Sequence, residues 1–307
     1  MVLTVVECSS VHLAVVTCGD RSSEMLTMLK SVLLFTRAKL HLHVFAEPHL
    51  QTTIRSHLQR WQTMFQNVDF DIRSVEFPEG QEGIWKRLFK PCASQRLFFP
   101  RLLEGVEKLI YFPEGEVFES NWYVKYARHS YVEPLGVNSG VMLMRLDRMR
   151  RTGWQELFWP LLGRHSANIS WGDQDLINIL FSQTPRSLYT FGCEWNYRPD
   201  HCLYASSTCA RAEARGLRLL HGSRGWFHGS RHGRGRAFQI LYNAFRDLPL
   251  TGETLQLRQS IQEEVVPRLR HALDLFENDP DCGSILEDVL RVFMNAEIRG
   301  IPLHWHL

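Results

Sequence analysis

Short apolar runs alternate with helical patterns along the first third of the chain. The run from His12 to Gly19 is almost wholly apolar and ends in glycine, which is typical of a strand buried on both faces of a parallel sheet. A polar segment that can cap a helix follows it. The pattern then predicts helices at 25–33 and 49–65 and strands at 40–45 and 70–77. This βαβαβ order predicts a doubly wound, Rossmann-like α/β sheet.

The remaining pattern keeps the α/β order and then becomes helical. It predicts a short helix near Trp85, helices at 94–103 and 174–181, and strands at 108–112, 136–146 and 217–220. From Thr251 onward, apolar residues recur on one helical face: Ile261, Val265, Leu269, Leu273 and Phe276. We therefore expect one α/β domain over residues 11–248 and a helical extension over 249–307 that packs on it.

Composition restricts the kind of partner. With 307 residues and 44% hydrophobic residues, the chain can bury a sizeable core. Its 35 Lys and Arg nearly balance its 33 Asp and Glu, so it lacks the positive field of a dedicated nucleic-acid binder. The N-terminal stretch before Glu7 is too short for a signal peptide or a membrane-spanning helix, and we expect no membrane anchor in this chain.

The seven cysteines contain no Cys-x-x-Cys pair, which argues against a zinc or redox centre. Cys193, Cys202 and Cys209 lie close together in a loop-rich stretch. They would allow a disulfide in a lumenal protein, and buried free thiols are the alternative. Asn168 begins an Asn-Ile-Ser sequon and is a candidate glycosylation site in a secretory compartment.

No glycine-rich dinucleotide or Walker motif follows the first strand, so an ordinary dinucleotide or ATP site is not expected. Thr17 and Cys18 end that strand, where open α/β sheets bind ligands, and could contact a base or ribose. A simple turn is the alternative. Arg96 lies one turn into a helix entered from a proline turn and could reach a diphosphate. The alternative is an ordinary solvated arginine.

Two further segments carry groups suited to sugars. Asn138 and Ser139 interrupt an apolar strand and could bind sugar hydroxyls, with a β-bulge as the alternative. Trp171 stands beside Asp173 and Gln174 before an apolar helix. A tryptophan ring with neighbouring carboxylate and amide groups is a common way to grip a sugar, although Asp173 could simply be the helix N-cap.

A glycine-rich segment follows the last predicted strand. His221, Gly222, Arg224 and Gly225 could cradle a phosphate, and His221 could also bind a metal. A solvated loop is the alternative interpretation, and we expect it to apply to residues 231–236.

In this order the segments resemble the glycogenin-like retaining glycosyltransferases (glycosyltransferase family 8), and most closely the glucoside xylosyltransferases. The resemblance covers about residues 12–245. It rests on residues 12–19, Lys90-Pro91-Cys92-Ala93-Ser94-Gln95-Arg96, residues 136–144, Trp171-Gly172-Asp173-Gln174-Asp175-Leu176, residues 195–202 and His221-Gly222-Ser223-Arg224-Gly225.

The resemblance implies a GT-A fold that transfers xylose from UDP-xylose, with retention and in α-1,3 linkage, to O-linked glucose on EGF-like repeats such as those of Notch. It implies Mn²⁺ as cofactor. It also implies a type II membrane protein that faces the endoplasmic reticulum or Golgi lumen, with an N-terminal anchor that is not present in this chain.

Site roles are carried over by position. The nucleotide and donor sugar would be bound by Thr17, Cys18, Asn138, Ser139, Gly222, Arg224 and Gly225, and Arg96 would steady the diphosphate. Asp173 and Gln174 would act near the anomeric carbon, and Trp171 and Trp195 would bind the acceptor. His221 would ligate Mn²⁺. This interpretation requires Arg96, Asn138, Asp173 and His221 to meet at one rim of the sheet.

One segment departs from the family pattern. After Leu109-Ile110-Tyr111 the family continues into an Asp-x-Asp pair that holds the metal, whereas here Glu114 and Glu116 follow. We do not expect these glutamates to replace the pair, because their surroundings match a region downstream of it. The chain is shortened after 111 and near 152. The alternative function is therefore a catalytically impaired or non-catalytic lumenal protein that binds a sugar or a partner. An α/β enzyme of another class is a third interpretation.

Overall fold

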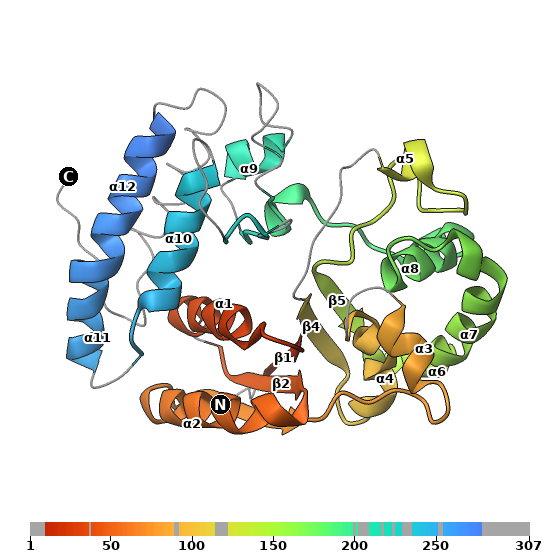
Figure 1. Cartoon of the computed structure of the whole chain (residues 1–307), viewed down its shortest axis with the longest axis horizontal. Coiled ribbons are helices and arrows are strands. Elements are labelled where there is room, and N and C mark those ends of the chain that lie inside the picture. Colours follow the sequence, from red (N-terminus) through yellow and green to blue (C-terminus); the bar gives the residue numbers. More distant parts are fainter. Residues whose placement is uncertain are drawn as a thin grey trace, which may run out of the picture.

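A mixed five-stranded sheet with the strand order β3-β2-β1-β4-β5 forms the centre of the molecule (Figure 1). The computed structural model describes residues 10–36, 38–88, 92–113, 122–198, 201, 209–215, 218–222, 225–228, 235–250 and 254–277. The strands are β1 (Val11–Thr17), β2 (Leu40–Ala46), β3 (Val68–Arg73), β4 (Lys108–Pro113) and β5 (Met142–Arg145). The first four are parallel, and β5 is antiparallel to β4. The predicted α/β sheet is confirmed.

Each face of the sheet has its own hydrophobic core, because successive side chains of a strand point to opposite faces. Leu13 and Val15 of β1 pack with helices α1 (Ser22–Phe35) and α2 (Pro48–Met64). Ala14 and Val16 belong to the other core, which contains Phe99 of α4 (Phe99–Leu102) and Leu146 of α6 (Leu146–Arg151). Helices therefore cover both faces, as a doubly wound sheet requires.

A third core lies beside β5. It is built by α3 (Glu82–Arg87), the 3-10 helix Ala93–Phe98, α7 (Trp154–His165) and α8 (Asp173–Gln183). Trp85, Trp154 and Phe158 are among its buried rings. In Figure 1 these helices lie on the right, with α5 (Trp122–Tyr126) above them.

Helices of the C-terminal part pack on the opposite side of the molecule. They are α9 (Ala210–Arg215), α10 (Gly235–Asp247), α11 (Thr254–Ser260), the π-helix Ile261–Val265 and α12 (Val266–Glu277). Ile261 and Val265 share the core of α1 and α2, and Lys30 of α1 donates hydrogen bonds to the carbonyl oxygens of Arg246 and Leu248. The described part of the predicted helical extension, residues 254–277, is helical, whereas residues 278–307 lie outside the described ranges. The extension as a whole and its boundary at residue 248 stay predictions.

Several predicted elements differ from the structure. The strand predicted at 136–146 is only Met142–Arg145, and Leu143 is 65% exposed, so it is not a buried strand. In residues 137–140, side chains of α8 take the backbone hydrogen bonds that a neighbouring strand would make: Asn178 binds the backbone of Val137, and Gln174 accepts from Ser139 N. The strand predicted at 70–77 ends at Arg73.

Two other segments also take a different form. The helix predicted at 94–103 is a 3-10 helix followed by the four-residue α4. In the strand predicted at 217–220, Leu217 lies outside the described residues, and Leu220 makes an isolated bridge to Tyr197. No helix within the described ranges is both long and apolar enough to cross a membrane.

Candidate functional site

The sheet topology brings separate segments together where the parallel strands end, at the carboxyl edge of the sheet. β1 and β4 are parallel and end at the same edge, where β1 ends in Thr17. Because β5 is antiparallel to β4, the residues that precede Met142 lie at this edge, and Met142 pairs with Tyr111 of β4. The Asn138–Gly140 segment therefore stands at the carboxyl ends of the parallel strands, which is where open α/β sheets bind ligands.

Arg96 and Asp173 form a buried ion pair at this edge. The Arg96 side chain donates from Nε to Asp173 Oδ2 and from Nη1 to the Ser139 carbonyl oxygen, 2.6 Å away. Its guanidinium also lies 5.5 Å from the centre of the Tyr111 ring. Arg96 is 6% exposed and Asp173 is 1% exposed, so the alternative of a solvated surface arginine is wrong.

Asp173 is the first residue of α8, and its N-cap is Gly172. The alternative in which Asp173 serves as the N-cap is therefore wrong. Burial raises the pKa of Asp173, and the Arg96 guanidinium opposes that rise. Burial lowers the pKa of Arg96, but the Asp173 carboxylate, together with Tyr111 and Tyr123, raises it overall. Asp173 Oδ1 is buried and has no hydrogen-bond partner in the described part of the chain.

The Gln174 side chain holds the Asn138–Gly140 segment. Its Oε1 accepts from Asn138 Nδ2 at 2.9 Å, from Ser139 N at 3.2 Å and from Ser139 Oγ at 3.3 Å. Asn138 Oδ1 accepts in turn from Gly140 N at 2.8 Å. These bonds fix the turn that leads into β5, and they replace the β-bulge that the sequence allowed.

Asn196 links this turn to His221. Its Nδ2 donates to Asn138 Oδ1 at 2.6 Å, and its Oδ1 lies 2.8 Å from His221 Nδ1. A side chain at Gly140 would place its Cβ 2.8 Å from His221 Cε1, so the backbone approach requires glycine. Arg96, Asn138, Asp173 and His221 thus meet in one hydrogen-bonded network, which we call the edge network, together with Ser139, Gln174 and Asn196.

A second layer beneath the edge network carries residues to which the sequence analysis gave no role. Tyr123 Oη donates to Asp175 Oδ1 at 2.9 Å and accepts from Gln174 Nε2 and Asn178 Nδ2. Asp175 Oδ2 accepts from the backbone N–H groups of Ser170 and Trp171. Asn178 lies four residues after Gln174 on α8, and this spacing could have identified it. Nothing in the sequence points to Tyr123.

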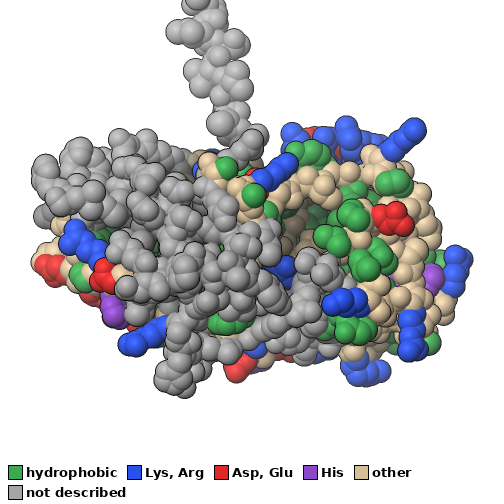
Figure 2. Space-filling view, turned by 90° about the horizontal axis from the view of Figure 1, so that it is seen from above, with side chains coloured by type: hydrophobic (Ala, Val, Ile, Leu, Met, Phe, Trp, Pro, Cys, Tyr) green, Lys and Arg blue, Asp and Glu red, His purple; other side chains and the backbone are tan. Residues whose placement is uncertain are grey.

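Aromatic side chains stand beside the edge network. The Trp171 ring meets Trp122 of α5 edge to face, with centroids 5.5 Å apart, and Trp122 also contacts Tyr126. Trp195 is 48% exposed. Seen from above, the molecule is hollowed near its centre, and hydrophobic side chains gather on the half that carries α5, α7 and α8 (Figure 2). Trp171 is half-buried, and the acceptor role of Trp171 and Trp195 stays a prediction.

The remaining predicted donor residues are placed as follows. Thr17 is buried at the end of β1, and Cys18 forms a disulfide with Cys92, the residue before the helix that carries Arg96. Gly222 follows His221 and packs against Phe227, and Gly225 has a positive φ of 66°. Arg224 lies outside the described residues, as do Glu114 and Glu116.

The predicted glycosylation site and two of the cysteines in residues 193–209 can be located in the fold as follows. Asn168 ends a 3-10 helix and is half-buried. Cys193 and Cys209 form a disulfide, which resolves the alternatives for these two residues, and Cys202 lies outside the described residues.

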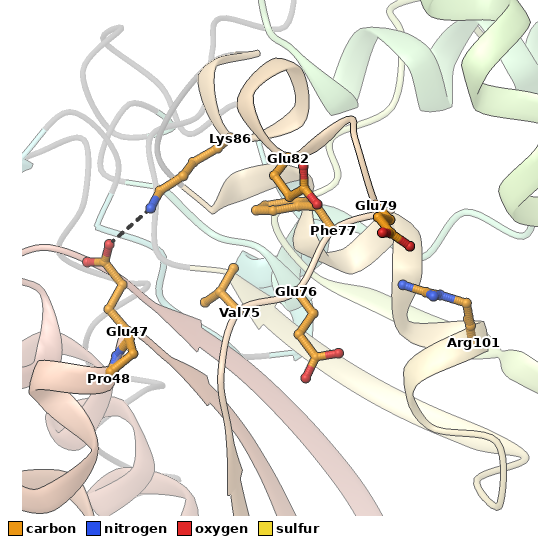
Figure 3. A pocket seen from close by; sticks show the side chains of 9 residues that line it. All are labelled: Glu47, Pro48, Val75, Glu76, Phe77, Glu79, Glu82, Lys86 and Arg101. Carbon is orange, nitrogen blue, oxygen red and sulfur yellow. Dashed lines mark ion pairs between the residues drawn. The ribbon is translucent and has the colours of Figure 1, made fainter.

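A separate cavity of about 470 Å³ lies near the carboxyl end of β2 (Figure 3). It is lined by Glu47, Pro48, Val75, Glu76, Phe77, Glu79, Glu82, Lys86 and Arg101. None of the predicted site residues lines it. Its link to them is Glu47, which accepts a hydrogen bond from Gly19 N at 2.8 Å, and this bond lowers the pKa of Glu47. The edge network, which contains six of the predicted site residues, is therefore the better candidate site.

The described residues do not by themselves form the expected Mn²⁺ site. His221 is buried, and its Nδ1 is bonded to Asn196. Within the described ranges, the one group of three or more His, Cys, Asp or Glu donors that could hold an ion contains His41, His43 and Asp71, not His221. Among the residues that the structure describes, the donor set around His221 does not fit Mn²⁺, and we assign no step of the reaction to a metal.

Known proteins similar in sequence identify the family. Glucoside xylosyltransferase 1 of Rattus norvegicus is 41% identical over 285 residues, which cover 80% of this chain. Glucoside xylosyltransferase 1 of Mus musculus is 40% identical, and the match covers 80% of this chain and 69% of the mouse protein. The Danio rerio protein of the same name is 38% identical, with 86% and 72% covered. The chain belongs to the glucoside xylosyltransferase family. It spans 64% of the length of the rat relative.

Solved structures show the same fold. The galactosyltransferase LgtC, in complex with donor and acceptor sugar analogues, superposes with a TM-score of 0.56 at 13% identity, over 81% of this chain and 99% of LgtC. The glycosyltransferase GlyE of Streptococcus pneumoniae gives a TM-score of 0.55 at 14% identity, over 83% of this chain and 64% of GlyE. The predicted GT-A fold is confirmed. No protein-family model matches the chain.

Proposed function

We propose that this chain is a glucoside α-1,3-xylosyltransferase. In this reaction the bond from xylose C1 to the phosphate oxygen of UDP breaks, a bond from C1 to O3 of a glucose forms with retention, and UDP and the proton of the glucose hydroxyl are released. The acceptor is glucose O-linked to EGF-like repeats such as those of Notch. Membership of the glucoside xylosyltransferase family supports this proposal.

The observation that carries the proposal is the edge network. Arg96, Asn138, Asp173 and His221 come from four distant parts of the chain and are joined by hydrogen bonds at the carboxyl ends of the strands. A transferase needs polar groups held in place before the substrate binds, because flexible groups would have to be ordered during the reaction. The edge network provides such a fixed set.

Asp173 and Gln174 are the proposed residues near the anomeric carbon. Asp173 Oδ1 is buried without a partner among the described residues, which suits it to accept a hydrogen bond from a sugar hydroxyl. Both ends of the Gln174 amide are already bonded within the protein, so we assign Gln174 chiefly to positioning Asn138 and Ser139. Asn138 and Ser139 would then face the donor sugar.

The remaining proposed roles follow the family pattern. Thr17, Cys18, Gly222, Arg224 and Gly225 would bind the nucleotide, and Trp171 and Trp195 would stack on the acceptor. We propose that Arg96 holds Asp173 and the Ser139 carbonyl rather than binding the diphosphate, because its Nε and Nη1 groups already serve these partners.

A secretory compartment is also proposed. The disulfides Cys18–Cys92 and Cys193–Cys209 support a lumenal location in the endoplasmic reticulum or Golgi, because disulfides form and persist in oxidising compartments. Glycosylation at Asn168 and an N-terminal anchor of the type II kind in the full-length protein belong to the same proposal.

A second candidate function is a catalytically impaired protein that binds a nucleotide sugar or partner. Two observations favour it. The donors around His221 in the described part of the chain do not form a metal site, and Arg96 is engaged with Asp173. The departing diphosphate would then have few positive groups to stabilise its charge, which would cost several kcal/mol at the transition state.

The two candidates differ in turnover. We would measure transfer from UDP-xylose to a glucosylated EGF-like repeat with Mn²⁺ present, and UDP binding by calorimetry, for the wild-type chain and for Asp173→Asn and His221→Ala. Glu263→Gln, on the exposed face of the π-helix, is the control. The transferase proposal predicts turnover that Asp173→Asn abolishes and Glu263→Gln retains. UDP binding without turnover above His221→Ala would support the second candidate, and a lack of both would reject both.

A further inference from the structure

Three histidines and an aspartate gather on one face of the sheet, away from the edge network. His12 of β1 lies next to His41 of β2, and His43 of β2 lies next to Asp71 of β3. His41 and His43 point to the same face because they are two residues apart in a strand. This face carries Ala14 and Phe45 farther along the strands, whereas Leu42 and Val44 lie in the core with α1 and α2.

The donor atoms of His41, His43 and Asp71 converge. His41 Nε2 lies 2.9 Å and His43 Nδ1 lies 2.6 Å from the same oxygen, Asp71 Oδ2, and the three donor atoms all lie within 4.8 Å of one another. One ion at a bond length of about 2 Å from each donor fits such a triangle. Two imidazoles and one carboxylate form a donor set typical of zinc sites with an open position for water.

Outer contacts orient two of the three ligands. His43 Nε2 lies 2.9 Å from His12 Nδ1, so His43 can donate its second ring N–H to His12 while Nδ1 binds an ion. Arg73 Nε donates to Asp71 Oδ1 at 2.7 Å, which leaves Oδ2 facing the histidines. Histidine and carboxylate ligands in metal sites usually carry such outer hydrogen bonds. The Arg73 charge opposes any cation, so the two imidazoles and the Asp71 carboxylate must supply the affinity.

The site is accessible and separate from the edge network. The His43 side chain is 4% exposed, while those of His41 and Asp71 are 33% and 29% exposed, so one side opens to solvent. His12 is the second residue of β1 and Thr17 is its last. Five residues of strand span roughly 16 Å, so an ion here would not contact a sugar held at the carboxyl edge.

We propose that His41, His43 and Asp71 form a binding site for one Zn²⁺ ion whose fourth position is open to water, with His12 and Arg73 as its outer hydrogen-bond partners. The ion would link β2 to β3, and β3 is an edge strand of the sheet. Because the site forms only when these strands are paired, Zn²⁺ would stabilise the folded chain. This inference does not depend on the proposed transferase activity.

Calorimetric titration of the chelator-treated chain with ZnSO₄ tests the site, with thermal unfolding as a second measurement. We expect one ion per chain and a higher melting temperature with Zn²⁺. His41→Gln and Asp71→Asn should each weaken binding at least about tenfold and remove the thermal shift, and His12→Gln should weaken it about 10- to 100-fold. His57→Gln, a half-buried histidine on α2, is the matched control and should change neither measurement.

His221→Ala distinguishes this site from any metal bound at the edge network and should retain both the binding and the thermal shift. His41 and Asp71 are partly exposed, so their variants are expected to fold, which circular dichroism checks. The proposal is overturned if the wild-type chain does not bind Zn²⁺, or if folded His41→Gln binds it as tightly as the wild-type chain.

Discussion

The Arg96 guanidinium and the Asp173 carboxylate form a buried ion pair that joins the 3-10 helix Ala93–Phe98 to the first residue of α8. Arg96 also binds the carbonyl oxygen of Ser139, so one side chain holds together three segments of the edge network. Because both charges are buried away from water, removing either residue would leave the other as an unpaired buried charge and destabilise the fold. The geometry of the pair therefore matters for stability as well as for the site.

Loss of Arg96 alone should destabilise the fold strongly. We expect Arg96→Met to lower the free energy of unfolding by about 3–5 kcal/mol, because Asp173 would remain as a buried, unpaired charge. The double variant Arg96→Met/Asp173→Leu should recover most of this loss. Urea unfolding of the two variants measures both effects. A loss under about 1 kcal/mol for Arg96→Met would show that Asp173 finds another partner or is protonated.

Substitution of Gly140 should disturb the edge network specifically. Gly140→Ala would force its Cβ against His221 and Asn138, and we expect a loss of about 1–3 kcal/mol in unfolding free energy together with weaker UDP binding. Gly163→Ala is the control, since a Cβ there meets nothing within 4 Å and Gly163 lies inside α7. That variant should stabilise the chain by about 0.5–1 kcal/mol. Equal effects of the two substitutions would contradict the crowded geometry at Gly140.

The Tyr123 hydroxyl should matter although it lies beneath the site. Tyr123→Phe removes one donor and leaves the buried groups of Asp175, Gln174 and Asn178 without this partner, so we expect a loss of about 1–3 kcal/mol. Tyr189→Phe is the matched control, because Tyr189 is 85% exposed and should change stability by less than about 0.5 kcal/mol. Denaturant unfolding of the two variants compares them. An effect no larger for Tyr123 than for Tyr189 would argue against the second layer.

His201 should make stability depend on pH. Burial, with a contribution from Arg198, lowers the pKa of His201 from 6.5 to about 4. Above pH 6.5 the ring is neutral in both the folded and unfolded states and contributes nothing. As the pH falls from 6.5 to about 4, the unfolded state gains a proton that the folded state does not, so stability is lost, by up to about 3 kcal/mol.

His201→Asn tests this effect, because an asparagine oxygen can replace the Nδ1 atom that accepts from Arg198 N. The difference in unfolding free energy between wild type and variant, measured from pH 7 to pH 4.5, should change steadily in favour of the variant. A constant difference over this range would mean that His201 titrates normally.

The disulfides should contribute unequally to stability. In the chain-entropy description, the Cys18–Cys92 bond closes a separation of 74 residues and is worth about 4 kcal/mol, whereas Cys193–Cys209 closes 16 residues and is worth about 3 kcal/mol. We expect the double variant Cys18→Ala/Cys92→Ala to unfold at lower urea concentration than Cys193→Ala/Cys209→Ala. Peptide mapping under non-reducing conditions checks the pairing. The reverse order of midpoints would count against this description.

The local elements and the candidate residues could be predicted from the amino-acid sequence. Buried strands, amphipathic helices and the ordered motifs are patterns over a few neighbouring residues, so β1, β2, α2 and α8 could be predicted close to their observed bounds. The same motifs led to Arg96, Asn138, Asp173 and His221. The prediction failed at 136–141, where an apolar run looks like a strand but side chains of α8 take its backbone hydrogen bonds.

The contacts among these residues depend on the three-dimensional packing of the chain. Asp173 pairs with Arg96, Asn196 connects Asn138 to His221, and Tyr123 lies beneath Gln174. Each of these contacts depends on the packing of segments far apart in the chain. A pattern over a few neighbouring residues does not specify which distant residues will be in contact. The same holds for His41, His43 and Asp71, whose donor atoms come together because parallel strands bring distant residues into register.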